Sequence, residues 1–270
     1  MEPGPVFPTD LFSGTAPYYD RYRPPYPDAL FDDLCRRLPV SGAGDLLDLA
    51  CGTGQVALPL CRRFARVVAV DQEDEFIVLG RAKAERFGIA HVEWITGAAE
   101  TVPAAGPFEL VTVGNAFHRL NRPAVAERMF SWVKPGGGVA LVWGETPHRG
   151  DRDWQRAMAA VLEAWTTKLG VVDRGPAGWE EHMDRYPGER ILGNAGFDYV
   201  GRFEFSVEES WTVETLTGFV YSTSFLSRPV VGRRAPQFEA ELGAVLRACS
   251  SEGTFQRSAT YAYQLARKPA

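Results

Sequence analysis

The chain has 270 residues, of which 45% are hydrophobic and 23% charged, and this composition is ordinary for a globular protein. A chain of this length buries a large core, either as one domain with insertions or as one domain with a cap. The net charge of −5 excludes an overall positive field that would draw the protein to nucleic acid or to an anionic membrane.

The first residues lack the basic region and apolar run of a signal peptide, and no apolar stretch approaches the ~20 residues needed to span a bilayer. The cysteines have no C-x-x-C spacing and are typical of reduced thiols; they are Cys35, Cys51, Cys61 and Cys249. We therefore expect a cytoplasmic protein with no membrane partner and no nucleic-acid partner, acting as a monomer or a homodimer.

The N-terminal region begins with a proline-rich stretch and continues with a cluster of aromatic and basic residues. This cluster, residues 18–23, precedes Pro24 and Pro25, which do not fit inside a continuous helix. A helical pattern follows and ends at Leu38. From its residues alone, the region is interpreted as a surface segment with aromatic anchors.

The most informative stretch, residues 45–54, reads Asp-Leu-Leu-Asp-Leu-Ala-Cys-Gly-Thr-Gly. An apolar run of buried-strand type carries Asp48 and leads into the turn Gly52-Thr53-Gly54, and a helix is predicted over Gln55–Phe64. This order lets backbone N–H groups approach a nucleotide-like ligand closely. A second strand, 67–70, ends at Asp71, where an acid is placed to bind two ribose hydroxyls.

The glycine turn alone leaves two cofactor classes open. Residues 52–57 also fit the looser dinucleotide pattern G-x-G-x-x-G/A. A carboxylate such as Asp48 beside the turn repels a pyrophosphate and attracts a cationic amino-acid group. S-adenosylmethionine carries an ammonium and a sulfonium and no phosphate, so the acid favours this cofactor over a dinucleotide.

Further elements alternate along the chain. The patterns predict a helix at Asp74–Phe87, a strand at His91–Ile95, a strand at Phe108–Val113, a helix at Pro123–Trp132, and a strand at Val139–Trp143 after the turn Lys134-Pro135-Gly136-Gly137. The apolar stripe from Trp154 to Leu169 predicts a further helix, and residues 170–189 predict a loop. Beyond them we expect helices at Arg190–Ala195, Val213–Ser222 and around Phe238–Leu246, and strands at Phe197–Val207 and Ala259–Leu265.

These landmarks, in this order, resemble those of class I S-adenosylmethionine-dependent methyltransferases, in the branch of trans-aconitate and quinone-biosynthesis enzymes. The resemblance covers about residues 12–145 and the last strand. It implies an α/β fold with a Rossmann-like sheet of seven strands, the last one antiparallel and inserted between the fifth and the sixth, and helices on both faces. It further implies a lid at 1–38, a cofactor-binding core at 39–145, a substrate cap with strand six at 146–235, and a C-terminal helix with the last core strand at 236–270.

The resemblance also implies which residues bind S-adenosylmethionine. Asp48 and the glycine turn bind its methionine end, Asp71 its ribose, and the loop after the third strand its adenine. The complete predicted set is Tyr19, Arg23, Asp48, Ala50, Gly52, Gly54, Asp71, Gln72, Ala98, Ala99, Glu100, Asn115 and Ala116. Ala98 stands where the family usually has an aspartate, so the backbone N–H of Ala99 and the side chain of Glu100 are expected to read the adenine.

His118 is the candidate general base because it follows strand four at the carboxyl edge of the sheet. A role in shaping the pocket is equally compatible with its position, since methyl transfer also proceeds by alignment alone. The predicted substrate-binding residues are Tyr22, Phe117, Trp143 and Tyr221. No His, Cys, Asp or Glu grouping has metal-ligand spacing, so no metal is expected.

The leading hypothesis is methyl transfer to an oxygen or nitrogen atom of a small metabolite, in a secondary-metabolite pathway. A nucleic-acid methyltransferase is the second hypothesis, weakened by the acidic balance and by Asn115-Ala116-Phe117-His118 in place of a D/N-P-P-Y or Pro-Cys motif. A dinucleotide-dependent oxidoreductase is the third. An inactive relative that binds the cofactor and regulates another protein is the fourth.

Overall fold

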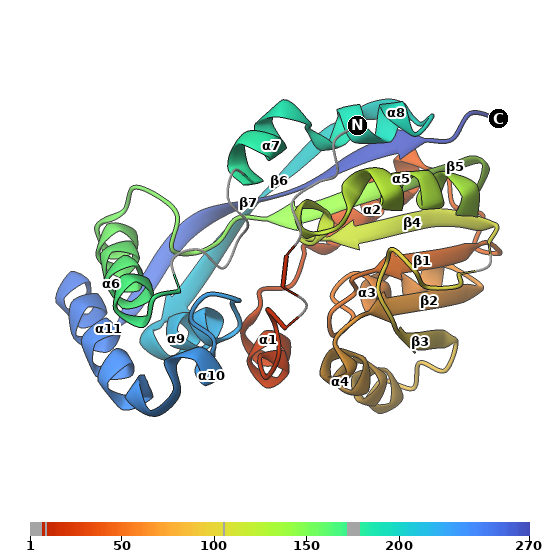
Figure 1. Ribbon diagram of the computed structural model, residues 1–270. Coiled ribbons are helices and arrows are strands. Elements are labelled where there is room, and N and C mark those ends of the chain that lie inside the picture. Colours follow the sequence, from red (N-terminus) through yellow and green to blue (C-terminus); the bar gives the residue numbers. More distant parts are fainter. Residues whose placement is uncertain (1–6, 9, 105, 172–178) are drawn as a thin grey trace.

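The computed structural model describes residues 7–8, 10–104, 106–171 and 179–270. Among these residues seven strands form one sheet, in the order β3-β2-β1-β4-β5-β7-β6 (Figure 1). The strands are β1 (Asp45–Leu49), β2 (Arg66–Asp71), β3 (Val92–Thr96), β4 (Phe108–Gly114), β5 (Val133–Gly144), β6 (Asp198–Thr212) and β7 (Thr254–Arg267). Strands β1 to β5 run parallel, and β7 lies antiparallel between β5 and β6. The predicted sheet is confirmed.

Helices cover both faces of the sheet, as predicted. They are α1 (Ala16–Tyr22), α2 (Asp28–Arg37), α3 (Ala57–Leu60), α4 (Asp74–Arg86), α5 (Arg122–Trp132), α6 (Asp153–Leu169), α7 (Trp179–Arg185), α8 (Gly188–Asn194), α9 (Val213–Tyr221), α10 (Arg228–Val231) and α11 (Ala235–Cys249), with short 3-10 turns η1 (Cys61–Arg63), η2 (Phe117–Arg119) and η3 (Gly232–Arg234). One core cluster packs α2, α3 and α4 on one face. A second cluster packs α5 and α8 on the other.

The side chains of the parallel strands explain why both faces are covered. Along β1, Leu46 belongs to one core cluster and Leu47 and Leu49 to the other, because successive side chains of a strand point to opposite faces. Such strands are buried on both sides and therefore read as continuous apolar runs. Gly80 lets α4 lie against β3, since a Cβ at this position would collide with the ring of Trp94.

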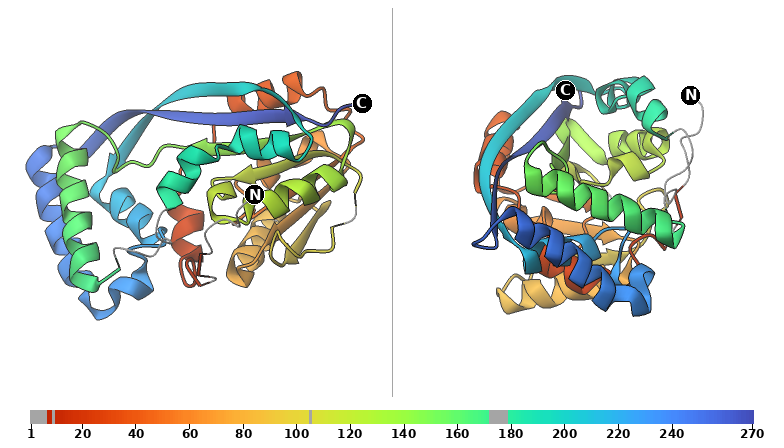
Figure 2. Two further views of the ribbon diagram at one scale, coloured as in Figure 1. Left: turned by 45° about the horizontal axis from the view of Figure 1, so that its top comes forward. Right: turned by 90° about the vertical axis from the view of Figure 1, so that its left-hand side faces the viewer.

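A helical cap stands beyond one end of the sheet. Strands β6 and β7 extend past the other strands into this cap, where α6, α9, α10 and α11 gather (Figures 1 and 2). The cap has its own hydrophobic core, which includes Trp165, Leu216 and Phe238 from three of its helices together with Trp211 and Phe255 from the two long strands. The cap is therefore built on a two-stranded extension of the main sheet.

The N-terminal helix α1 lies between the cap and the sheet. On the cap side the ring of Tyr22 covers Gly218 of α9, where a Cβ would collide with it. On the side of the sheet, Lys83 of α4 pairs with Asp20 at 2.5 Å, and the rings of Tyr19 and Phe76 lie 4.9 Å apart. Helix α1 thus contacts both halves of the molecule, as a lid would.

Three predicted segments differ from the structure. Part of the loop predicted at 170–189 lies outside the described residues, and the remainder contains α7, so the loop was wrong there. The helix predicted at Gln55–Phe64 is shorter, because the glycine turn continues to Val56 before α3 begins. Strands β6 and β7 are longer than predicted, because their outer halves pair with each other up to Thr212 and Thr254.

The C-terminal helix α11 also differs in its surroundings. Its buried residues Phe238, Leu242 and Leu246 belong to the cap cluster, and the ring of Phe238 lies 5.4 Å from that of Trp165 on α6. Helix α11 therefore packs in the cap, whereas the sequence grouped it with the last strand of the main sheet.

Candidate functional site

Two adjoining cavities lie at the carboxyl ends of β1 and β4. These strands are neighbours whose following connections lead to opposite sides of the sheet, and open α/β sheets bind their ligands at such a point. The larger cavity has a volume of about 400 Å³, which falls within the range of small-molecule sites. The smaller one has about 40 Å³. Both are lined by Tyr19, Ala50, Gly114 and Asn115, so they share one wall.

The shared wall holds two strained backbone positions. Ala50 has φ 51° and Asn115 has φ 53°, and these are the non-glycine residues with positive φ in the described part of the chain. A non-glycine residue in this region costs about 1–3 kcal/mol and persists where the surroundings enforce it. The strain lies at the tips of β1 and β4, where it turns the chain around the junction of the two cavities.

Asp71 lies at the carboxyl end of β2 and lines the larger cavity, with 6% of its surface exposed. Its carboxylate accepts hydrogen bonds from the backbone N–H of Gly52 at 2.8 Å and of Glu73 at 3.0 Å. Burial raises the pKa of Asp71, while hydrogen bonds from the backbone N–H groups of Glu73, Gly52 and Gln72 lower it. A carboxylate offers about four lone-pair sites, so these bonds leave it able to accept from a further donor. The acid therefore ties the glycine turn to β2 and remains able to accept from a ligand.

The glycine turn beside Asp71 requires glycine at its first position. Gly52 has φ 56°, a conformation that L side chains rarely adopt, and lines the larger cavity. A Cβ there would lie 3.2 Å from Cε1 of Tyr19. Gly54 has φ 89° and lines neither cavity; a Cβ there would lie 2.8 Å from the ring of Trp94. Gly52 therefore allows Gln55 and Tyr19 to pack closely at the cavity wall, and Gly54 allows close packing against Trp94.

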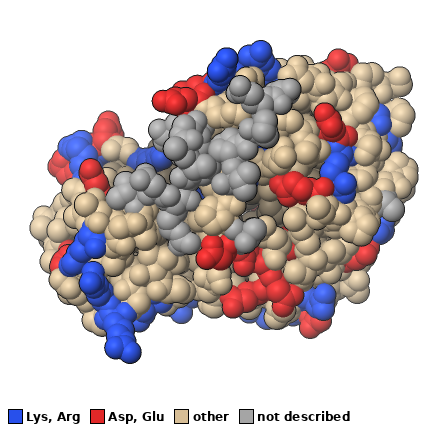
Figure 3. Space-filling model, in the orientation of Figure 1, with Lys and Arg blue, Asp and Glu red and all other residues tan. Residues whose placement is uncertain are grey.

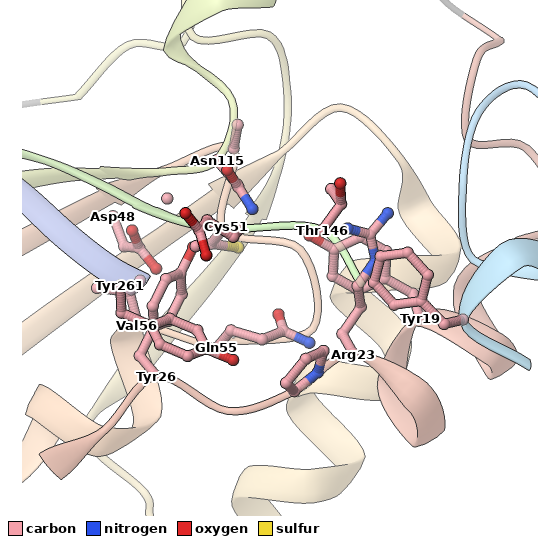
Figure 4. Close-up of a pocket in the computed structure, with 16 residues that line it drawn as sticks. Tyr19, Arg23, Tyr26, Asp48, Cys51, Gln55, Val56, Asn115, Thr146 and Tyr261 are labelled. Atoms are coloured by element: carbon pink, nitrogen blue, oxygen red, sulfur yellow. The ribbon is translucent and has the colours of Figure 1, made fainter. Parts of the chain in front are cut away.

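The remaining residues predicted to bind the cofactor divide between the cavities. The larger one is lined by Gln72, Ala98, Ala99, Glu100 and Ala116. Ala99 is buried, and Oε1 of Glu100 accepts a hydrogen bond from the backbone N–H of Asn121 at 2.9 Å. The smaller one is lined by Asp48 and Arg23 (Figure 4). Apart from Gly54, every residue predicted to bind the cofactor lines one of the two cavities.

Asp48 is the buried acid of the smaller cavity and is 1% exposed, and Glu145 is a second acid in the lining. Its carboxylate accepts from the hydroxyl of Thr112 at 2.7 Å and from the backbone N–H of Ala57 at 3.0 Å. Burial raises the pKa of Asp48 to about 7, although both hydrogen bonds lower it. Near neutral pH a cation beside this carboxylate would therefore favour its ionised form.

Arg23 is the cation of the smaller cavity. Its Nε donates to Oγ of Ser222 at 2.8 Å and its Nη2 to the carbonyl of Ser222 at 3.1 Å. The guanidinium carbon lies 4.7 Å from the ring centroid of Tyr19 and 4.8 Å from that of Phe219. Burial lowers the pKa of Arg23, but an arginine remains charged at neutral pH. The smaller cavity thus presents one base, Arg23, and two acids, Asp48 and Glu145.

Two buried oxygen atoms of the smaller cavity lack a hydrogen-bond partner among the described residues. They are Oε1 of Gln55 and Oγ1 of Thr146, and both residues line the cavity. In Figure 4 the side chain of Thr146 is drawn beside Arg23, and that of Gln55 lies in the middle of the close-up. An unpaired buried polar atom costs about 1–3 kcal/mol, so a ligand that bonds to these atoms would recover that energy.

The four residues predicted to bind substrate line neither cavity. Tyr22 packs on α9, and its hydroxyl donates to Glu214 at 3.2 Å. Phe117 belongs to the core cluster that packs α5 and α8 on the sheet. The guanidinium carbon of Arg202 lies 4.6 Å from the ring centroid of Trp143 and covers this ring. Tyr221 lies in the cap core, where its hydroxyl donates to Glu239 at 2.8 Å. Each of these rings therefore packs or bonds within the protein.

His118 also lines neither cavity, although it lies one residue from a lining residue. Its Nε2 accepts a hydrogen bond from Nε of Arg119 at 3.0 Å. Burial lowers the pKa of His118 to about 3, and the charges of Arg119 and Arg122 lower it further in the same direction. The imidazole is thus neutral at pH 7, and its Nε2 lone pair is engaged by a neighbouring cation.

Several lining residues were missed by sequence reasoning, namely Tyr26, Gln55, Glu145, Thr146, Tyr261, Phe12, Phe76 and Arg119. Tyr26 follows the double proline of the N-terminal cluster, and Gln55 follows the glycine turn, so local signals for these two existed. Thr146 and Tyr261 come from distant segments that only the antiparallel pairing of β5 with β7 brings together.

Comparison with known proteins agrees with this geometry. A family model described as a methyltransferase domain matches residues 46–137. The ubiquinone/menaquinone biosynthesis C-methyltransferase of Rubrivivax gelatinosus is 35% identical over 175 residues, which cover 61% of this chain and 67% of that protein. An uncharacterised methyltransferase of Mycobacterium tuberculosis is 30% identical over 152 residues, which cover 56% of this chain and 58% of the relative.

Among solved structures, a protein of Anaeromyxobacter dehalogenans described as a candidate type II methyltransferase has a TM-score of 0.58 at 23% identity, covering 92% of this chain and all of that one. This likeness concerns the fold. The family match and the Rubrivivax relative show that the chain belongs to the class I S-adenosylmethionine-dependent methyltransferases, and the predicted family is confirmed. The chain spans 58% of the length of the mycobacterial relative.

Proposed function

We propose that the protein transfers the methyl group of S-adenosylmethionine to an oxygen or nitrogen atom of a small molecule. The observation that carries this proposal is the distribution of charge between the two cavities. The smaller cavity holds two acids, Asp48 and Glu145, and one base, Arg23. Of these, Asp48, which is buried, and Arg23 match the ammonium and carboxylate of a methionine zwitterion. The larger cavity holds Asp71, which matches the two ribose hydroxyls of an adenosyl group.

The fit extends to the backbone and to the unpaired atoms. Gly52 leaves room beside Tyr19, and Oε1 of Gln55 and Oγ1 of Thr146 offer acceptors to the methionine end. In this assignment the cofactor spans both cavities and crosses the shared wall at Ala50 and Asn115. The residues predicted from the sequence to bind the cofactor are proposed in these roles, except Gly54.

S-adenosylmethionine supplies a methyl group bonded to a sulfonium. In the transfer, the lone pair of the acceptor forms a new bond to the methyl carbon, and the electrons of the broken carbon–sulfur bond stay on sulfur. The protein must align the acceptor with this bond and exclude water. Helix α1 and the cap lie on the cavity side of the sheet (Figure 2). We propose that they align the acceptor and exclude water. We propose the lid at 1–38, the core at 39–145, and a cap that also includes α11.

An oxygen or nitrogen acceptor is proposed because its lone pair attacks directly. A hydroxyl or N–H acceptor releases its proton to solvent, whereas a carbon acceptor, as in the relative named as a C-methyltransferase, must first be activated as a carbanion or enol. His118 stays the predicted base, but its engaged Nε2 and low pKa favour transfer by alignment alone. The role in secondary metabolism stays a prediction.

A small-molecule acceptor is favoured over nucleic acid by the surface. Acidic and basic side chains are interspersed on the face drawn in Figure 3, without a continuous basic stripe among the described residues there. In the described part of the chain, no helix is long and apolar enough to cross a membrane.

The test is a transfer assay with S-adenosylmethionine labelled in its methyl group. The full chain is incubated with a small-molecule extract, and in parallel with DNA and with RNA. We expect label in a small-molecule product that is separated from S-adenosylmethionine, and we expect Asp71→Ala to form much less of this product. Label in nucleic acid instead would support the runner-up function, and label in neither fraction would contradict the proposed activity.

A further inference from the structure

Arg119 is a cation on the wall of the larger cavity, held in a fixed orientation by neutral groups. Its Nε donates to Nε2 of His118 at 3.0 Å, and its Nη1 and Nη2 reach Oγ of Ser224 at 3.3 and 3.4 Å. The guanidinium carbon lies 4.8 Å from the ring centroid of Phe12. These contacts fix the plane of the guanidinium, and N–H groups remain for a ligand because arginine has five of them.

Within the described ranges Arg119 forms no ion pair with a carboxylate; the groups that touch it are an imidazole, a hydroxyl and aromatic rings. Burial lowers the pKa of Arg119 to about 10, and the charge of Arg23 contributes in the same direction. The guanidinium is therefore charged at neutral pH and stands in surroundings that disfavour charge. A partly buried cation of this kind is stabilised when a ligand brings a negative charge.

The cofactor does not bring that charge in the arrangement proposed above. Its carboxylate is assigned to Arg23 in the smaller cavity, and its sulfonium adds a positive charge near the shared wall. We propose that Arg119 binds a carboxylate of the methyl acceptor, so that the acceptor is an organic acid. This inference rests on the proposed function and adds the substrate class to it.

Two features of the cavity favour a carboxylate over a phosphate. Arg119 is the one basic residue among the described residues that line the larger cavity, while Asp71, Glu73 and Glu100 are acidic. One planar guanidinium matches the two oxygens of a monoanionic carboxylate, whereas a phosphate dianion would meet net negative charge. Apolar side chains of Phe7, Leu11 and Phe12 flank the cation and suit the hydrocarbon body of such an acid.

His118 is a positioning residue in this arrangement. The neutral imidazole accepts the Nε–H of Arg119 and so directs the Nη edge of the guanidinium. A protonated imidazole could not accept this bond, and the low pKa of His118 keeps it neutral. The residue that the sequence singled out as a base thereby acquires a role that needs no proton transfer.

The test measures binding of two shape-matched pairs, butyrate with butyramide and benzoate with benzamide, to the full chain saturated with S-adenosylhomocysteine. Titration calorimetry is carried out on wild type, on Arg119→Gln, and on the control Arg21→Gln, which removes an exposed arginine of α1 paired with Glu214 at 3.1 Å. We expect at least one acid to bind wild type and the control about tenfold or more tightly than its amide. Arg119→Gln should lose this preference and keep its affinity for S-adenosylhomocysteine within about threefold.

Each other outcome overturns the inference in a distinct way. Equal binding of acid and amide to wild type, or a preference that persists in Arg119→Gln, means that Arg119 does not select an acid. A larger loss of S-adenosylhomocysteine affinity in Arg119→Gln means that Arg119 binds the cofactor carboxylate. If wild type does not bind S-adenosylhomocysteine, the proposed function fails and the inference fails with it.

Discussion

In the proposed site, we expect the buried acid Asp48 to make cofactor binding depend on pH. Its pKa is raised from about 3.8 to about 7 by burial, which disfavours the ionised form by about 4 kcal/mol. A bound ammonium beside the carboxylate stabilises the ionised form and lowers the pKa again. Binding at acidic pH must therefore release the proton of Asp48, and the affinity rises as the pH increases towards 7.

The magnitude follows from the fraction of Asp48 that is ionised in the free protein. With a pKa of about 7, this fraction increases about fifteenfold between about pH 5.5 and about pH 7, and the affinity for S-adenosylhomocysteine should increase by the same factor. Calorimetry at both values measures this change, and repeating it in buffers of different ionisation enthalpy measures the proton released. The ammonium of the ligand stays charged between these two pH values, so its own titration contributes little to the change in affinity.

Two controls isolate Asp48. The ligand 5′-methylthioadenosine lacks the amino-acid group, so its affinity should not change over this range. The variant Asp48→Asn should bind S-adenosylhomocysteine more weakly than wild type at about pH 7 and without the pH dependence. An affinity that does not change with pH in wild type, or that changes equally in Asp48→Asn, would refute the assignment of Asp48 to the ammonium.

The same raised pKa sets the sign of a stability effect. The folded protein retains a proton on Asp48 that the unfolded chain releases above about pH 4. The contribution of this group to stability is therefore present below about pH 4 and is lost as the pH rises through about 7. Without ligand, Asp48→Asn should raise the melting temperature relative to wild type near pH 8 and not near pH 4.

Three further predictions concern the ribose, the candidate base and the cap. Asp71→Ala should weaken S-adenosylhomocysteine binding about 100-fold, because two charge-assisted hydrogen bonds of about 1.5 kcal/mol each are lost; an unchanged calorimetric affinity would mean that the ribose is bound elsewhere. With a saturating acceptor, His118→Gln and His118→Ala should keep kcat within about tenfold of wild type, whereas a loss of 100-fold or more in both would restore the base role. Tyr221→Phe should lower the free energy of unfolding by about 1 kcal/mol, because the hydroxyl bond to Glu239 is lost; a change in cofactor affinity instead would place this ring at the site.

The cofactor side of the site could be predicted from the sequence because its signals are local. Asp48 and Asp71 each lie at the end of an apolar run, and the carboxyl ends of adjacent parallel strands meet at one edge of the sheet. Gly52 adopts a conformation that favours glycine, which the sequence displays directly. These residues therefore line the two cavities, as expected from the sequence, while their role in binding stays a prediction.

The substrate-binding residues could not be predicted, because whether an aromatic ring points into a cavity or into the core is not visible in the sequence. Tyr221 lies on α9 near Phe219, yet Phe219 lines the smaller cavity and Tyr221 turns into the cap core. Trp143 lies near the carboxyl end of β5, but the guanidinium of Arg202 on β6 covers its ring. An aromatic residue is as suitable for packing as for binding, and the spacing of such residues does not distinguish the two.

The extension of β6 and β7 that supports the cap escaped prediction for a related reason. The outer half of β6 alternates between exposed and half-buried residues such as Glu208 and Glu209, and this polar composition resembles a turn region. The strand persists there because β7 pairs with it residue by residue. Tertiary pairing thus overrides local preference, and it carries Arg257 to Glu209 at 2.7 Å in the extension that supports the cap.

The central claim is that the paired cavities bind the adenosyl and methionine parts of one cofactor. Titration calorimetry with S-adenosylmethionine, S-adenosylhomocysteine and NADH in parallel tests it most directly. We expect micromolar binding of both adenosyl compounds and no binding of NADH. Binding of NADH without the adenosyl compounds would contradict the assignment of Asp48 and Arg23 and, with it, the proposed methyl transfer.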